Sequence, residues 1–145
     1  MTDTQVVELL GRQRLIGELL TDELEVAIPM RDRGVDLIVY ADLSRQVTRF
    51  VSRPIQMRAS TAAAFGVNQK YGCIADLILA HVWRLADPSR ATTFGLRYSE
   101  AVRVADEMGW TRTRSWIDGR AYGTSRPSSR FLELLEPNRM TRGRW

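Results

Sequence analysis

The chain has little of the chemistry on which many metal sites and nucleophilic enzymes depend. Among its 145 residues there is one cysteine (Cys73), one histidine (His81) and one lysine (Lys70). A single cysteine excludes an internal disulfide and is typical of a reducing compartment, so we expect a cytoplasmic protein. One histidine and one cysteine also exclude a structural zinc site. Apolar residues flank His81, which predicts a packed core histidine.

The sequence also lacks segments that enter membranes. No apolar run approaches the roughly 18 to 20 residues needed to span a bilayer. The first residues show no basic region followed by an apolar one, as a secretory signal would. We therefore expect no membrane partner. Glycine-rich phosphate loops and the GxGxxG and GxSxG motifs are missing from the sequence, which removes the commonest nucleotide-binding and hydrolase signatures.

What remains is an ordinary globular composition with an uneven charge. Hydrophobic residues make up 44% and charged residues 26% of the chain, which suits one domain with a sizeable core. The net charge of +4 gathers near the C-terminus, where residues 111–145 hold eight arginines and three acidic residues. This basic third is either a surface that contacts phosphates or a solvated arginine-rich face.

Hydrophobic periodicity predicts an alternation of helices and strands. Helices are predicted over 4–20, with Asp3 or Thr4 as the cap, over 99–109, and from Pro127 to Pro137. Strands are predicted over 24–28, 35–40, 47–58 (one long strand or two short ones), 74–83 and 91–98. We expect a hairpin turn at 42–45, a short strand or a loop at 62–72, and a polar segment without regular structure at 111–125.

This order predicts an α/β fold, close to α+β, in which a central mixed β-sheet of four to five strands is flanked by helices. We expect a single domain over residues 1–137. Residues 138–145 form a basic C-terminal tail, for which the sequence predicts a loosely ordered, flexible segment.

Two short segments carry the candidate chemistry. Asp36 opens an apolar strand, and about twenty residues later Gln56 and Arg58 lie near the end of another. Side chains at i and i+2 of a strand point to the same face, so Gln56 and Arg58 share a face, toward which Asp36 could project. Oxygen ligands held close together beside a basic group are what divalent-metal cleavage of a phosphodiester requires.

These segments resemble the PD-(D/E)XK nuclease superfamily, especially its small predicted-endonuclease branch. The matching residues are Arg33-Gly34-Val35-Asp36-Leu37-Ile38-Val39 and Pro54-Ile55-Gln56-Met57-Arg58. The resemblance covers residues 6–116 and implies a restriction-endonuclease-like fold. It also implies that Asp36, Gln56 and Arg58 are the catalytic residues, and that Asp36 and Gln56 hold Mg²⁺ or Mn²⁺ if the site is active.

The motif departs from the family pattern at important positions. Gln56 stands in place of an acidic ligand and removes one negative charge. Arg58 stands in place of the catalytic lysine, and arginine does not substitute well for lysine in a positioning role. Arg58 is therefore expected to contact phosphate or to form an ion pair with Asp36, which would block metal binding. The glutamate that many members carry in the first helix is replaced by Arg12, with Glu18 as an uncertain substitute.

The residues predicted to contact nucleic acid are Arg58, Lys70, Arg112 and Arg114. Trp110 and Trp116 bracket the last two and belong either to the core or to a base-stacking surface. We favour DNA binding by a nuclease-like fold whose metal site is degenerate and inactive. A Mg²⁺- or Mn²⁺-dependent endodeoxyribonuclease and a non-catalytic protein-interaction domain stay open, and so does a homodimer.

Overall fold

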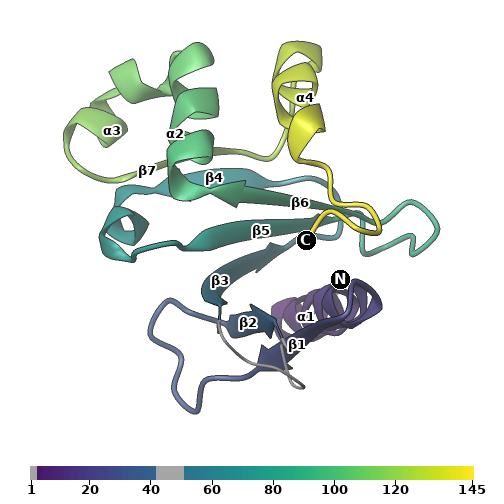
Figure 1. The fold of residues 1–145 in the computed structure, drawn as a ribbon. Coiled ribbons are helices and arrows are strands. Elements are labelled where there is room, and N and C mark those ends of the chain that lie inside the picture. The colour runs from purple at the N-terminus through teal and green to yellow at the C-terminus, as the bar shows by residue number, and fades with distance from the viewer. Residues whose placement is uncertain (1–2, 42–50) are drawn as a thin grey trace.

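A five-stranded mixed sheet forms the centre of the molecule (Figure 1). The structure is a computed structural model that describes residues 3–41 and 51–145. The strand order is β1-β2-β3-β5-β6, in which β3 and β5 pair in parallel and the other neighbours are antiparallel. The strands are β1 Leu24–Ala27, β2 Leu37–Ala41, β3 Ser52–Ala59, β5 Ile78–Trp83 and β6 Thr92–Arg97.

The predicted α/β class and mixed sheet are confirmed. The turn predicted at 42–45 and the first residues of the strand predicted over 47–58 lie outside the described residues. None of the helices in the described ranges is long and apolar enough to cross a bilayer.

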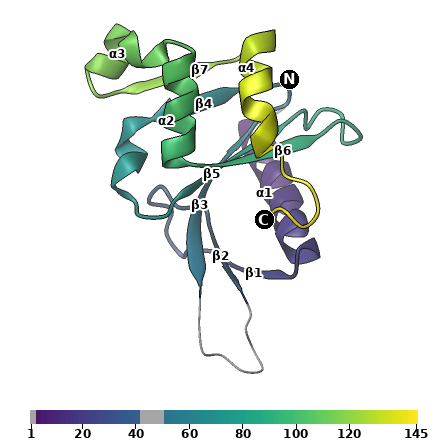
Figure 2. The same ribbon diagram turned by 45° about the horizontal axis from the view of Figure 1, so that its top comes forward.

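Helix α1, Thr4–Thr21, covers one face of the sheet (Figure 2). Asp3 is its N-cap and accepts a hydrogen bond from the Gln5 N–H at 2.8 Å, which satisfies a donor that the first turn leaves free. Its buried residues recur every four positions, at Val7, Gly11, Leu15 and Leu19, because that spacing returns to one side of a helix. With this face α1 contacts a core drawn from β2, β3 and β5: Leu37, Val39, Ile55, Met57, Ala80 and Val82.

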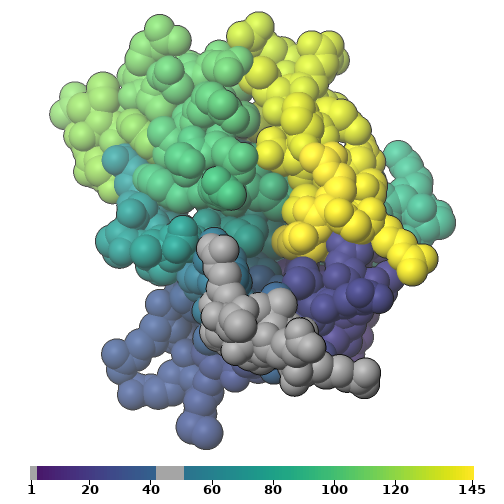
Figure 3. Space-filling model, viewed as in Figure 1, coloured from purple at the N-terminus to yellow at the C-terminus, as the bar shows by residue number. Residues whose placement is uncertain are grey.

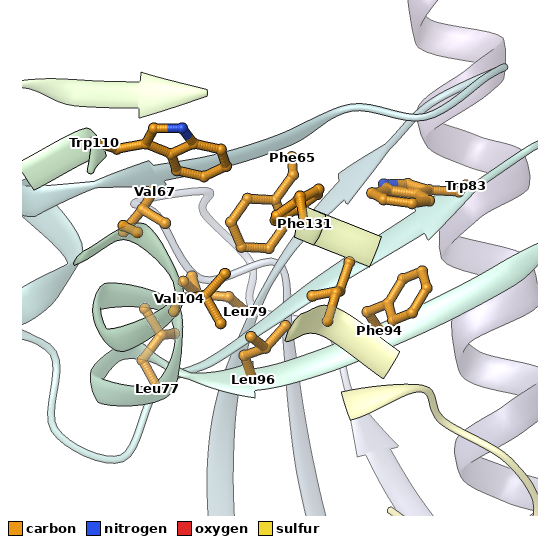
Figure 4. Close-up of a cluster of buried hydrophobic side chains, with 13 residues drawn as sticks. Phe65, Val67, Leu77, Leu79, Trp83, Phe94, Leu96, Val104, Trp110 and Phe131 are labelled. Atoms are coloured by element: carbon orange, nitrogen blue, oxygen red, sulfur yellow. The ribbon is translucent and has the colours of Figure 1, made fainter. Parts of the chain in front are cut away.

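The opposite face carries a larger core under two helices and a small second sheet (Figures 1 and 4). Aromatic rings fill its centre, where Phe65, Trp110 and Phe131 contact one another and Trp83 packs against Phe94. The covering elements are α2 Tyr98–Glu107, α4 Ser129–Leu135, and the antiparallel pair β4 Phe65–Asn68 and β7 Ala121–Thr124. This core also decides between the two roles considered for Trp110. The ring is buried, so it belongs to the core and is not exposed for base stacking.

The segment 111–125 is more ordered than the sequence predicts. Its short elements are the end of η2 Trp110–Arg112, α3 Arg114–Ile117 and β7, and η1 Gln69–Cys73 follows β4. The Gln69 side chain donates hydrogen bonds to the carbonyls of Trp116 and Arg120, at 2.6 and 3.0 Å. These bonds fasten the end of α3 to η1, so the polar segment has an anchor that periodicity does not reveal.

The C-terminal tail lies against α1 and β6. Met140 donates its N–H to the Thr93 carbonyl at 2.8 Å, and the tail then turns toward the end of α1. There the Asp22 carboxylate accepts the backbone N–H groups of Gly143, Arg144 and Trp145 at 2.7, 3.1 and 3.1 Å. These bonds lower the pKa of Asp22. The segment expected to be loosely ordered is thus in contact with both neighbouring elements.

His81 is a core residue, as predicted. It is 2% exposed, stacks on Phe65 with ring centroids 4.3 Å apart, and its Nε2 lies 3.2 Å from the Gly66 carbonyl. Burial lowers the pKa of His81 to about 4, because a charged imidazolium would lose its hydration. The ring is therefore neutral at physiological pH and helps to fix β4 over β5.

We expect His81 to make the fold sensitive to mild acid. The unfolded chain takes up a proton near pH 6.5, but the folded chain does so only near pH 4. Stability is therefore lost as the pH falls through this window, by about 2 kcal/mol between pH 7 and 5. Urea unfolding of the wild type and His81→Leu at both pH values measures this loss, and the variant should lack it. Parallel pH dependences for the two proteins would contradict this account.

Candidate functional site

The candidate site lies where β2 stops pairing with β3. The two strands pair from Tyr40 with Ser52 to Leu37 with Ile55, and in this register the next hydrogen-bonded pair after Leu37 and Ile55 would be Val35 with Met57. Instead the Asp36 side chain turns in, and its Oδ2 accepts the Met57 N–H at 2.6 Å. The carboxylate thus takes the place of a backbone carbonyl and ends the ladder.

Gln56 binds the same residue, Met57, through its other backbone group. Its Nε2 donates a hydrogen bond to the Met57 carbonyl at 3.0 Å. The N–H and C=O of one strand residue point to the same edge, so Asp36 and Gln56 together satisfy both backbone groups of Met57 on the open edge of β3. Both residues that the nuclease resemblance assigns to the metal are therefore also structural caps on Met57.

Because β2 has left, a hollow opens along this edge of β3. Its volume is about 620 Å³, and we call it the β3-edge cleft. The main polar residues of its lining are Glu8 from α1, Gln56 and Arg58 from β3, and Asn68 from β4, with Tyr71 from η1 beside them. A volume of this size is within the range of ligand-binding pockets.

Arg58 lies in this cleft without an acidic partner. Its side chain is on the face of β3 opposite α1 and rests against Gly66 of β4, where a Cβ atom would collide with the guanidinium. Neither Asp36 nor any other acid forms an ion pair with Arg58 in the described part of the chain. Of the two roles expected for Arg58, the ion pair with Asp36 is therefore absent, and the phosphate contact stays a proposal.

The electrostatic surroundings of Asp36 identify an acid of α1 that the sequence analysis did not consider. Partial burial raises the pKa of Asp36, and the negative charges of Asp32 and Glu8 raise it further, against the Met57 N–H and the Arg12 guanidinium. The acid of α1 that lies nearest is thus Glu8, one turn before Arg12. The i, i+4 spacing of Glu8 and Arg12 was the available signal, because it puts both on one side of α1.

Glu18, the substitute considered from the sequence, lies elsewhere. Its Oε1 accepts a hydrogen bond from the Thr93 hydroxyl at 2.8 Å and is 2.9 Å from Arg14 Nε. Thr93 belongs to β6, the far edge of the sheet from β2. Burial raises the pKa of Glu18. Glu18 is therefore neither a plain surface charge nor a residue that can join Asp36 at a metal.

The donor set is a poor fit to a hard divalent cation. One oxygen of Asp36 already accepts a hydrogen bond, and Gln56 offers only a neutral amide oxygen. Within residues 3–41 and 51–145, no three His, Cys, Asp or Glu side chains gather in a way that could hold a metal. Such cations prefer several anionic oxygens. The site is better suited to an anion at Arg58 than to a metal at Asp36.

The other predicted basic residues differ in their relation to the cleft. Lys70 is exposed, and its Nζ lies 5.0 Å from the ring centroid of Tyr71, which lines the cleft. Arg112 and Arg114 are exposed but are not among the lining residues, and Arg114 is 3.5 Å from Asp118. Arg58 thus lines the cleft and Lys70 lies beside one of its lining residues, Tyr71, whereas no such contact joins Arg112 or Arg114 to it in the described residues.

Comparison of the chain with protein-family models, curated proteins and solved structures finds no match.

We expect Asp36 to act as a cap whose charge is dispensable. Asp36→Asn keeps an oxygen for the Met57 N–H, so its free energy of unfolding should stay within about 0.5 kcal/mol of the wild type. Asp36→Ala leaves that donor unpaired and should cost about 1–2 kcal/mol. Denaturant unfolding at pH 7 measures both. Equal losses in the two variants would mean that the charge itself is required.

Proposed function

We propose that the protein binds nucleic acid through the β3-edge cleft without cleaving it. The observation that supports this most directly is the unpaired guanidinium of Arg58 in the β3-edge cleft, next to the backbone of Met57 that Asp36 and Gln56 bind. Arginine carries its charge at any physiological pH and offers a planar fork of donors that matches a phosphate. Permanent positive charge without a protein counter-ion is the property that a phosphate site needs.

The surroundings of Arg58 favour a ligand of this kind. Lys70 adds a second positive charge near the mouth of the cleft, and the amides of Gln56 and Asn68 offer polar contacts without charge. The acid Glu8 on the rim opposes binding, which fits a modest affinity that depends on Arg58.

The restriction-endonuclease-like fold and the PD-(D/E)XK lineage belong to the same proposal. Their support is the order of α1, three antiparallel strands and a parallel β5, with Asp36 and Gln56 both bonded to Met57 and Arg58 the next residue of β3. A cytoplasmic location also stays a proposal, supported by the exposed free thiol of Cys73, which suits a reducing compartment.

Arg58→Gln should weaken DNA binding and its dependence on salt. A phosphate contact releases condensed counterions, so removing one should lower the slope of log K against log salt by about 1. Fluorescence anisotropy with a labelled duplex and a labelled single strand, between 50 and 200 mM salt, gives both quantities. Arg58→Lys should keep the slope, because the charge remains.

The matched control is Arg103→Gln, which removes an exposed arginine from α2 outside the cleft. Its affinity and slope should equal those of the wild type. Gly66→Ala supplies an independent check, because the new methyl group must displace the Arg58 guanidinium without removing its charge. Binding that is unchanged in Arg58→Gln, or weakened equally in Arg103→Gln, would contradict a specific role for the cleft.

A metal-dependent endonuclease is the second candidate, and one observation favours it. Asp32 and Glu8 lie close enough to Asp36 to raise its pKa, and a divalent cation would relieve this repulsion between carboxylates. Calorimetric titration of Mg²⁺ and Mn²⁺ into the wild type and Asp36→Asn distinguishes the candidates. We expect no heat of binding at millimolar metal; saturable binding that Asp36→Asn abolishes would instead support the nuclease.

A further inference from the structure

The outer face of α1 has the composition of a contact surface. The side turned away from the sheet carries Val6, Leu9, Leu10, Gln13, Gly17 and Leu20. The four large apolar residues among them are between 43% and 53% exposed. A helix at the surface of a monomer normally places polar residues on this side, whereas one that is apolar all round is buried.

The charged residues of α1 do not share this outer face. Arg14 pairs with Glu18 at 2.9 Å and donates a hydrogen bond to the Ala91 carbonyl at 2.8 Å, so both turn toward the β6 side of the fold. On the other flank, the charge of Arg12 lowers the pKa of Asp36, and Glu8 lines the β3-edge cleft. The strip between these two charged flanks is therefore uncharged over the whole helix.

The outer face is also complementary to itself. Val6 and Leu20 lie seven residues before and after Gln13, and Leu9 and Gly17 lie four residues before and after it. If two copies of α1 cross antiparallel about Gln13, Leu9 of one copy meets Gly17 of the other, and Val6 meets Leu20. Among residues 3–41 and 51–145, no atom apart from the neighbouring helix backbone lies within 4 Å of a Cβ placed on Gly17, so the glycine leaves room for a leucine. A two-fold contact requires such a protrusion and its recess on one surface.

A hollow beside Gly17 extends this recess. Its volume is about 450 Å³, and Met140 and Trp145 of the C-terminal tail form its far wall. The tail and α1 lie next to each other on the same side of the molecule (Figure 3). The hollow therefore adjoins the apolar strip of α1 at Gly17, although the charged residues Arg14, Glu18, Asp22 and Arg142 also line it.

We propose that this surface binds the same surface of a second copy, with the two α1 helices antiparallel about Gln13. The area sets the strength of the contact. An 18-residue helix is roughly 27 Å long, and a single helical strip covers much less than the ~800 Å² per partner of a standard interface, even with the tail hollow added. We therefore expect a reversible dimer with a Kd in the range of about 10–100 µM.

Sedimentation equilibrium of the full chain, from about 2 to 500 µM, tests the proposal. The wild-type mass should rise from the monomer value of 16.5 kDa toward twice that value. Leu9→Glu puts a charge at the predicted contact and should remain monomeric throughout. The matched control is Ile117→Glu, which changes an equally apolar, 69% exposed side chain on α3 and should dimerise like the wild type.

A cross-link locates the two-fold axis. In a Cys73→Ser background, Gln13→Cys should form a disulfide between copies under mild oxidation, since residues on the axis face themselves at the short distance a disulfide needs. Ile117→Cys in the same background should not. A wild type that stays monomeric at 500 µM overturns the proposal. A dimer that survives Leu9→Glu and does not cross-link through residue 13 overturns it as well.

Discussion

The hydrogen bond between the Asp36 carboxylate and the Met57 N–H is the contact on which the candidate site depends. A sheet strand must satisfy its peptide groups on both sides, and β3 loses its β2 neighbour after Ile55. Asp36 supplies the missing acceptor at 2.6 Å, and Gln56 supplies the missing donor. The two side chains thus satisfy the backbone of Met57 without a partner strand, and the β3-edge cleft lies along the part of β3 that follows.

The parallel pairing of β3 with β5 explains why the cleft has a second wall. Two parallel neighbours need a crossover connection, and here it contains β4 and η1, which return over the face opposite α1. Gly66 of β4 comes close enough to be bonded by His81 and to support Arg58. The crossover therefore places a glycine at the spot where any side chain would displace the guanidinium, and so determines where the positive charge stands.

The sequence predicts the parts of this fold that have strong periodicity. The first helix, the apolar strands and the α/β class follow from spacings of four and two residues, and the core position of His81 follows from its apolar neighbours. The sequence left 62–72 open between a short strand and a loop, and β4 is that short strand. β7 and α3 were not recognisable, because each is four residues long within a polar segment, and hydrogen bonds from Gln69 to distant carbonyls help to hold α3 in place. The sequence also could not predict which side chains contact one another or the backbone. Motif spacing brings Asp36, Gln56 and Arg58 together, but only the folded register shows that the first two bind the Met57 backbone.

This distinction bears on how far a motif can predict chemistry. In a metal site the carboxylate must turn its oxygens to the cation. Here Asp36 holds the Met57 N–H with one of its two oxygens. A metal would have to compete with that bond and would find an uncharged amide as the second ligand. The need to satisfy the backbone at the edge of β3 is therefore enough to explain why Asp36 and Gln56 stand at these two positions. Arg58 has no such role at the strand edge, and its charge is therefore the feature on which the proposed function depends.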